Sequence, residues 1–214
     1  MNQFNFAVNQ RDEACKLVIQ YHYSHRVPSN IQLVGTWHED GGLFGDSGEC
    51  VAACFFSIPP TRWKEEVWEL SRLVRKEDVR CSLTGLISKT CKWIKSKGLM
   101  DLLVSFADNT QGHHGGIYQA SSWNYAGLRK AGVDGLLING VFRPGRSCNS
   151  DYGTRSPSKL SEMKPHWDIK PHYDMGKYLY WKALNIHGER KARRLGLDSI
   201  QYAKPQTEIK EGTI

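Results

Sequence analysis

The segment Leu99–Phe106 constrains the fold of this chain more than any other part of the sequence. It is almost wholly apolar, as is typical of a strand buried on both faces of a sheet. A helix is expected over Leu83–Lys97, with Ser82 as its N-cap and Gly98 as its stop. A buried strand that follows a helix predicts an α/β fold with helices on both faces of the sheet.

The remaining pattern fits the same sheet. Apolar residues at helical spacing predict a helix over Arg11–Tyr23, and Gly115–Trp123 is expected to be a short helix. The last two strands before residue 145 are expected to form an antiparallel end to the sheet, and Gly145–Lys164 is expected to be a loop. Further strands are expected at Ile31–Trp37, Cys50–Ile58, Val67–Val74, Asn124–Leu128, Leu136–Arg143 and Tyr178–Leu184.

The length of 214 residues suits one domain with a buried core. We expect that domain to span residues 1–187, with a basic, flexible tail over residues 188–214. The chain has no apolar run as long as a membrane span, and its first ten residues lack the layout of a signal peptide. Its six scattered cysteines are typical of free thiols. We therefore expect a cytoplasmic protein.

Basic residues outnumber acidic ones by 29 to 22, which gives a net charge of +7. This balance suits a nucleic-acid partner, because neutralising phosphates supplies much of the affinity. Many basic proteins bind no nucleic acid, so both interpretations stay open. The sequence also leaves open whether the chain is a monomer or a homodimer.

Chemically useful side chains are densest between the apolar strand and the short helix. The strand brings Ser105 and Asp108 to its C-terminal end, where open α/β sheets bind ligands. A glycine-rich turn with two histidines follows, and Tyr118 lies in the first turn of the helix, where its phenol can donate a proton. The alternative is that Ser105 and Asp108 only end a strand and cap a helix.

Two further features are candidates for a site. Arg72 lies inside a predicted core strand, where an arginine is costly unless paired, so we expect it to face a pocket or to pair with a carboxylate. His22 and His25 are spaced so that both imidazoles can share one helix face and bind a metal. The alternative for both histidines is exposure at a helix end.

The segment Val104–Gly127 (VSFADNTQGHHGGIYQASSWNYAG) resembles the signature of the phage Mom proteins, a divergent GNAT-like group. Glu69–Val74 (ELSRLV) and His22-Tyr23-Ser24 are similar to two further motifs of that family. The resemblance implies a GNAT-like three-layer fold with a mixed, mostly antiparallel sheet. It also implies a transferase that adds an acetamido (carbamoylmethyl) group to adenine N6 in phage DNA, which protects the DNA from restriction.

The resemblance also implies roles for individual residues. Tyr118 falls on the position of the tyrosine that protonates the coenzyme A thiolate. Asp108 is then expected to orient or deprotonate the adenine amine, Ser105 to position the substrate, and Arg72 to face the pocket. The resemblance further implies Fe2+, for which His22 and His25 are the expected ligands.

The usual glycine-rich pyrophosphate motif is missing after the central strand. Either acetyl-CoA or a related acyl-CoA meets other residues, or it binds poorly. The residues expected to meet the cofactor are Ser71, Arg75, Lys76, Arg80 and Ser82. Those expected to meet DNA, two of them by stacking on an extruded base, are His113, His114, Trp123, Tyr125, Arg143 and Arg146.

Two other functions stay open. The first alternative is an ordinary GNAT N-acetyltransferase that acts on a protein or a small amine. The second is a non-catalytic DNA-binding module. Simple acetyl transfer makes an N–C(=O) amide and not an N–CH2 bond, so the implied product needs chemistry beyond the GNAT scaffold.

Overall fold

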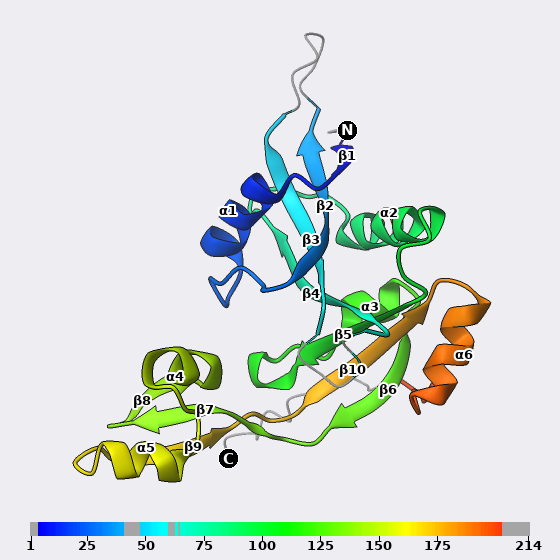
Figure 1. Ribbon diagram of the computed structural model, residues 1–214. Coiled ribbons are helices and arrows are strands. Elements are labelled where there is room, and N and C mark those ends of the chain that lie inside the picture. Colours follow the sequence, from blue (N-terminus) through cyan, green and yellow to red (C-terminus); the bar gives the residue numbers. More distant parts are fainter. Residues whose placement is uncertain (1–3, 41–47, 60–62, 64, 203–214) are drawn as a thin grey trace, which may run out of the picture. The chain divides into compact units, whose positions relative to one another are not determined.

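The computed structural model describes residues 4–40, 48–59, 63 and 65–202, and for Arg146 the backbone alone (Figure 1). The chain divides into two compact units, where we expected a single domain. The first unit comprises residues 1–106, 115–127 and 179–214, and the second comprises residues 107–114 and 128–178. Residues 128–178 contain an apolar cluster of their own, around Leu136, Cys148 and Leu160.

The first unit is built on a seven-stranded sheet. Strands β1 to β4 pair antiparallel in sequence order, and β4 pairs parallel with β5. The expected α/β fold with a mixed, mostly antiparallel sheet is therefore confirmed. The strands, in their order across the sheet, are β1 (Phe4–Val8), β2 (Ile31–Glu39), β3 (Cys50–Ser57), β4 (Trp68–Arg75), β5 (Leu102–Asp108), β10 (Lys177–Ala183) and β6 (Asn124–Arg129).

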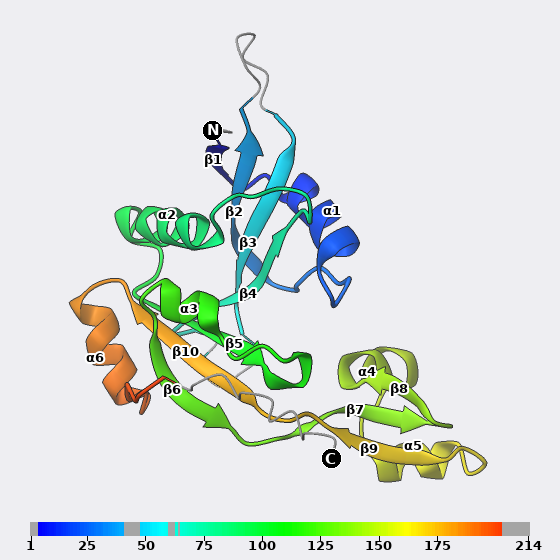
Figure 2. The same ribbon diagram turned by 180° about the vertical axis from the view of Figure 1, so that it is seen from behind.

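Helices α1 (Arg11–Tyr21) and α2 (Leu83–Ser96) cover opposite faces of this sheet (Figures 1 and 2). Side chains alternate between the two faces of a strand. Phe55 packs against α1, whereas the thiol of its neighbour Cys54 lies 3.2 Å from the Thr90 hydroxyl on α2. All eight residues of β3 are buried, because a helix covers each side of this strand.

The ends of α2 form as the sequence predicts. The Ser82 hydroxyl accepts a hydrogen bond from the Gly85 backbone at 3.0 Å, which confirms the N-cap. Gly98 has a φ of +60°, in the left-handed region where glycine is favoured after a helix.

The second unit holds a three-stranded sheet in the order β8-β7-β9, so the expected antiparallel end of the main sheet is wrong. The strand expected at residues 136–143 is a hairpin, because Asn139 and Gly140 both have positive φ and turn the chain. The elements of the second unit are β7 (Val133–Ile138), β8 (Val141–Pro144), β9 (Ile169–Tyr173), the short 3-10 helix η2 (Asn109–Gln111), α4 (Gly145–Tyr152) and α5 (Pro157–Met163).

The loop expected over Gly145–Lys164 is also wrong, since α4 and α5 occupy most of it. The Ser156 hydroxyl caps α5, and Pro157 stands in its first turn. The apolar residues of both helices are few, and of these Cys148 and Leu160 are buried against the small sheet. A mostly polar helix of this kind shows little apolar periodicity, so the sequence pattern did not reveal it.

A helix occupies the start of the segment that was expected to be a flexible tail from residue 188. Residues Ile186–Arg194 form helix α6, whose N-cap Asn185 accepts a hydrogen bond from the Gly188 backbone at 3.0 Å. Gly188 and Ala192 are buried, because this face of α6 packs on the rest of the first unit. Residues 203–214 lie outside the described part of the chain. Among the described helices, none is long and apolar enough to cross a membrane.

Candidate functional site

The strands β4 and β5 form a fork. Over their fully described lengths, they pair only at Trp68–Leu103 and Glu69–Val104. They then diverge, as Figures 1 and 2 show. At the apex of the fork, the Ser105 hydroxyl donates a hydrogen bond to the Leu70 carbonyl at 2.7 Å. This side-chain bond takes the place of the next backbone hydrogen bond between the two strands.

A β-bulge shapes the β4 arm of the fork. Phe55 lies opposite Arg72 and Phe56 opposite Leu70, so Ser71 is the extra residue. Its hydroxyl donates to the Phe55 carbonyl at 3.2 Å and also contacts the Ser57 hydroxyl. A bulge redirects the side chains that follow it, and bulges are enriched beside active sites.

Arg72 follows this bulge and is half-buried. Its Nε donates to the Arg26 carbonyl at 3.3 Å and its Nη1 to the Ser71 carbonyl at 2.6 Å. These bonds tie β4 to the segment that connects α1 with β2. Arg72 therefore lies beside the fork, and backbone carbonyls compensate for part of the cost of burying it.

Tyr118, on helix α3 (Gly116–Ala120), lies beside Ser105 at the fork. The side chain is buried, with 9% of its surface exposed, and its ring packs 5.1 Å from that of Tyr180 and 5.5 Å from that of Trp123. Burial raises the pKa of Tyr118 to about 12, contact with the Ser105 hydroxyl acts in the opposite direction, and the Glu69 carboxylate raises it further. The phenol is therefore protonated at neutral pH, which is the state a proton donor needs.

The position of α3 depends on Gly115. This residue has a φ of +83°, and a Cβ there would lie 2.2 Å from Cε2 of Tyr180. Only glycine satisfies both conditions without strain. The close approach of this backbone to the Tyr180 ring places the first turn of α3, and with it Tyr118, beside β5 and β10.

Three residues of this site were not expected from the sequence. Burial is the largest cause of the raised pKa of the Tyr118 phenol. Three residues, Glu69, Tyr23 and Tyr180, lie close enough to raise it further. Two of them, Glu69 and Tyr23, fall within the motifs that resemble the Mom family. The sequence thus carried a signal for these two, whereas Tyr180 is brought in by the packing of β10.

The aromatic residues expected to stack on a base are core residues. Trp123 is fully buried, and Tyr125 is 5% exposed with its ring 5.2 Å from that of Tyr180. A buried ring offers no free face to a base, so this arrangement does not support the stacking role. Among the described residues, Nε1 of Trp123 has no hydrogen-bond partner.

His22 and His25 do not share a helix face, because α1 ends at Tyr21. Nδ1 of His22 accepts a hydrogen bond from the Ser24 backbone at 3.1 Å, and Nδ1 of His25 donates to the Ile19 carbonyl at 2.8 Å. The geometry on which the predicted metal site depended is therefore absent. His22 instead stacks on Tyr23, with 4.3 Å between the ring centroids.

Most of the residues expected to meet coenzyme A already have partners within the protein. Arg75 donates to the Cys81 carbonyl at 3.1 Å. Lys76 forms an ion pair with Glu49, which raises the pKa of Lys76. The remaining three are Ser71 in the bulge, Ser82 at the cap of α2 and Arg80, which is exposed.

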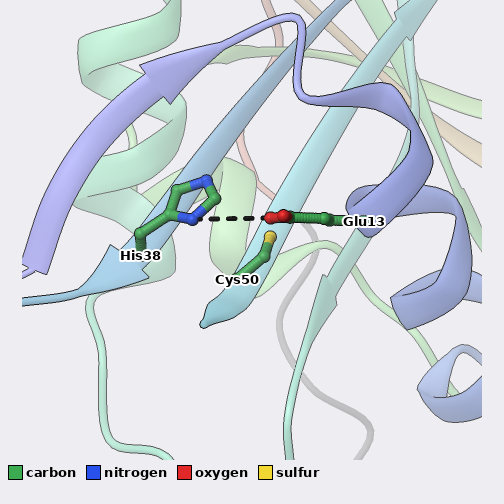
Figure 3. A group of neighbouring side chains, drawn as sticks. All are labelled: Glu13, His38 and Cys50. Carbon is green, nitrogen blue, oxygen red and sulfur yellow. Dashed lines mark ion pairs between the residues drawn. The ribbon is translucent and has the colours of Figure 1, made fainter. Parts of the chain in front are cut away.

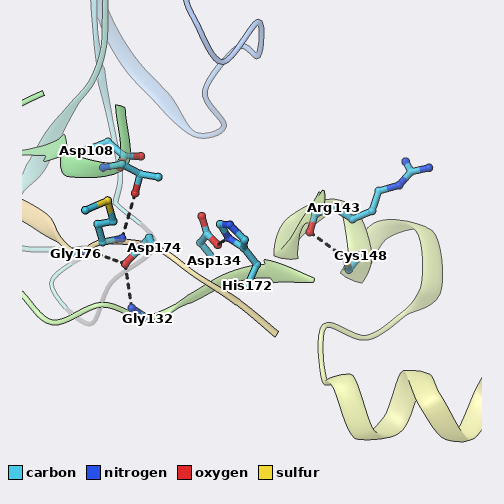
Figure 4. A network of polar contacts seen from close by, with 10 residues as sticks. Asp108, Gly132, Asp134, Arg143, Cys148, His172, Asp174 and Gly176 are labelled. Atoms are coloured by element: carbon cyan, nitrogen blue, oxygen red, sulfur yellow. Dashed lines mark hydrogen bonds and ion pairs between the residues drawn. The ribbon is translucent and has the colours of Figure 1, made fainter. Parts of the chain in front are cut away.

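The other predicted residues belong to the second unit, whose polar network is shown in Figure 4. Oδ1 of Asp108 accepts a hydrogen bond from the Thr110 backbone at 3.0 Å, so this carboxylate caps η2. The side chain of Arg143 is exposed on β8. His113 and His114 lie in the turn after η2, and the side chain of Arg146 lies outside the described part.

Nδ1 of His172 lies 2.7 Å from Oδ1 of Asp134 in the same network. Oδ1 of Asp174 accepts from the Gly132 and Gly176 backbones, each at 3.0 Å. These contacts hold β7, β9 and the segment after β9 together.

Comparison with known proteins gives one family match. The model of the Mom protein family matches residues 3–204. A search of curated proteins finds no match.

Solved structures similar to this chain include several acetyltransferases. A putative acetyltransferase from Acinetobacter baylyi has 11% identity and a TM-score of 0.48, over 86% of this chain and 93% of its own. A GNAT family acetyltransferase from Elizabethkingia anophelis, with acetyl-CoA bound, has 13% identity and a TM-score of 0.43, over 86% and 99%. The Bacillus subtilis acetyltransferase in complex with CoA has 12% identity and a TM-score of 0.44, over 86% and 100%.

Proposed function

Because the chain belongs to the Mom protein family, we propose that it is a transferase that modifies adenine in double-stranded DNA. The product proposed is adenine carrying an acetamido group on N6, which protects phage DNA from restriction. The observation that carries the proposal is a protonated phenol, Tyr118, beside Ser105 at the apex of the β4–β5 fork.

The fork suits an acyl-CoA donor. Beyond Glu69, the residues of β4 have no β5 residue opposite them over the described strands. A chain of amide groups, such as the pantetheine arm, pairs with a strand edge of this kind in the way an added strand does. Ser71, in the bulge, lies on this arm. Bound in the fork, the donor would supply the activated acyl group.

In this proposal Tyr118 acts as the general acid. When the adenine amine attacks the thioester carbon and the carbon–sulfur bond breaks, the phenol donates its proton to the leaving thiolate. Ser105 holds the phenol in place, and the high pKa of Tyr118 keeps the proton available before the bond breaks. Attack at the carbonyl carbon gives an N6-acyl amide, so this acyl transfer alone does not make the acetamido product, whose N–CH2 bond and amide nitrogen need a separate nitrogen source or metal-dependent step.

The target amine lies inside the duplex, so the base must leave the stack at a cost of about a few kcal/mol. The net charge of +7 supports binding of the duplex backbone. Asp108 is proposed to orient or deprotonate the amine, and His113, His114, Arg143 and Arg146 are proposed to contact DNA.

Mass spectrometry of nucleosides tests the proposal. The chain is expressed in bacteria, and the host DNA is digested and searched for a new deoxyadenosine species. Tyr118→Phe is expected to lower the yield at least about a hundredfold, since general acids contribute roughly 10²–10⁴ to rates. Tyr173→Phe, a change at an exposed tyrosine of the second unit, is the control and should leave the yield unchanged.

Two outcomes would contradict the proposal. One is unmodified DNA from cells that contain the folded wild-type chain. The other is turnover of acetyl-CoA with protein or small amines by a preparation that leaves DNA unchanged, which identifies an ordinary N-acetyltransferase. Full modification by the Tyr118→Phe variant would retain the function but remove the phenol from its mechanism.

A further inference from the structure

Three potential metal ligands converge at the end of the β2–β3 hairpin, and none belongs to the site described above. Glu13 lies in the first turn of α1, His38 near the end of β2 and Cys50 at the start of β3. One donor atom from each lies within 4.8 Å of the other two. Figure 3 shows the carboxylate, the imidazole and the thiol directed toward the same point.

The separation of the charged pair suits two ligands of one metal ion. Nδ1 of His38 lies 3.6 Å from Oε2 of Glu13. This is longer than a hydrogen bond, which spans about 2.7–3.2 Å. It lies within the range of about 3.3–3.8 Å that separates two ligand atoms of a tetrahedrally coordinated ion with bonds of about 2.0–2.3 Å.

The surroundings hold the His38 ring in a fixed orientation. Nε2 lies 3.0 Å from the Thr36 hydroxyl, which in turn lies 3.2 Å from the Ala7 carbonyl. Ligand histidines are commonly oriented through their second nitrogen in this way. Nδ1 also lies 3.0 Å from the Gly48 carbonyl.

Among the described residues, Cys50 has one hydrogen-bond contact, and it is long: the thiol lies 3.8 Å from the Ala52 carbonyl. Burial raises the pKa of Cys50 to about 12, and the Glu13 carboxylate raises it further. A divalent cation at this point would stabilise both the thiolate and the carboxylate. Glu13 has 54% of its side chain exposed, so an ion can reach the cluster from solvent.

We propose that Glu13, His38 and Cys50 bind one Zn2+ ion. The mixed set of carboxylate, imidazole and thiolate is typical of zinc, and the Gly48 carbonyl oxygen or a water can take the fourth position. Binding displaces the proton of the Cys50 thiol into solvent, and His38 binds through Nδ1 as a neutral imidazole whose proton is on Nε2, facing the Thr36 hydroxyl. The ion would fasten the start of α1 to the β2–β3 hairpin, and its binding does not depend on the proposed transferase activity.

Zinc binding by the untagged, chelator-treated full chain tests the site. After gel filtration with Zn2+, elemental analysis should find one zinc per wild-type chain. Glu13→Gln is expected to weaken binding at least tenfold, whereas Asp12→Asn, in the same helical turn, should not weaken it. Glu13 is exposed, so this pair of variants remains informative even if changes at buried positions impair folding.

Cobalt identifies the sulfur ligand. With Co2+ in place of Zn2+, the wild-type chain and Cys15→Ser should both show a thiolate-to-metal charge-transfer band in the near ultraviolet, and Cys50→Ser should lack it. Circular dichroism establishes that each variant is folded. The proposal is overturned if the folded wild-type chain binds no zinc, or if Cys50→Ser keeps the cobalt band.

Discussion

At the scale of single residues, Tyr118 shows how the core sets the chemistry of one group. The phenol lies among aromatic rings and beside the Glu69 carboxylate, and both surroundings disfavour the phenolate. The same burial that suits a proton donor limits access of substrate. In the proposed role, the Tyr118 side chain therefore gains exposure when the donor binds.

The raised pKa of Tyr118 predicts a loss of stability in alkaline solution. Its ordinary pKa is 10.0 and its folded value is about 12, so between these pH values the unfolded chain has lost the proton and the folded chain has kept it. The contribution is complete below pH 10 and declines by up to about 1.4 kcal/mol per pH unit toward pH 12. Urea unfolding from pH 9 to 12 should show a shallower decline for Tyr118→Phe than for wild type. Parallel curves would contradict the assignment, since the buried thiols are present in both proteins.

Gly115 predicts a second effect at this scale. Gly115→Ala places a methyl group against the Tyr180 ring at a φ of +83°, and we expect it to lower the free energy of unfolding by about 3 kcal/mol. Gly112→Ala is the matched control, because Gly112 has a φ of +68° with open space around it, and it should cost only about 1 kcal/mol. Equal losses in urea unfolding would show that the Tyr180 contact has no effect.

At the scale of elements, α6 shows why a charged segment need not be a tail. Its basic side chains are divided between solvent and internal partners, since Lys191 lies 3.4 Å from Asp101 and Arg194 pairs with Glu66. Its small residues allow close packing, and a Cβ on Gly188 would lie 2.1 Å from the Asp101 carbonyl oxygen. The helix is anchored by this contact face, although its large apolar residue Ile186 is exposed.

Asn185 predicts how strongly α6 is held. Its side chain caps the helix and also donates to Oδ1 of Asp101 at 2.7 Å, a bond that lowers the pKa of that carboxyl. Asn185→Ala removes both bonds and should lower the free energy of unfolding by about 1–2 kcal/mol. Asn185→Ser keeps the cap alone and should lose less than half as much. Identical melting temperatures for wild type and Asn185→Ala would contradict the role of this residue.

At the scale of the whole molecule, the net charge determines how the chain is expected to bind DNA. The charge of +7 predicts that duplex binding weakens steeply with salt, because each neutralised phosphate releases counterions. With as few as three phosphate contacts, affinity should fall roughly 40-fold between 50 and 200 mM salt. Fluorescence anisotropy with a labelled duplex measures this dependence. An affinity that does not change with salt would argue against DNA as the partner.

The sequence by itself determined the local structure of the first unit. The apolar run before residue 107 predicts a buried strand, and Ser82 and Gly98 predict the ends of α2, because caps and apolar periodicity act between near neighbours in the chain. The Asn139-Gly140 turn was also readable from the sequence, but the apolar residues on either side of it suggested one continuous strand. The family motifs placed Ser105 and Tyr118 in one site, which the structure brings together.

Only the tertiary structure decided which residues meet across long stretches of chain. It divided the chain into two units, buried Trp123 and Tyr125 in the core, and separated His22 from His25 by ending α1 at Tyr21. It also brought Glu13, His38 and Cys50 together from three elements. These outcomes depend on how buried surfaces fit one another, and a sequence pattern carries no information on that fit because its periodicity reports only which face of an element is apolar.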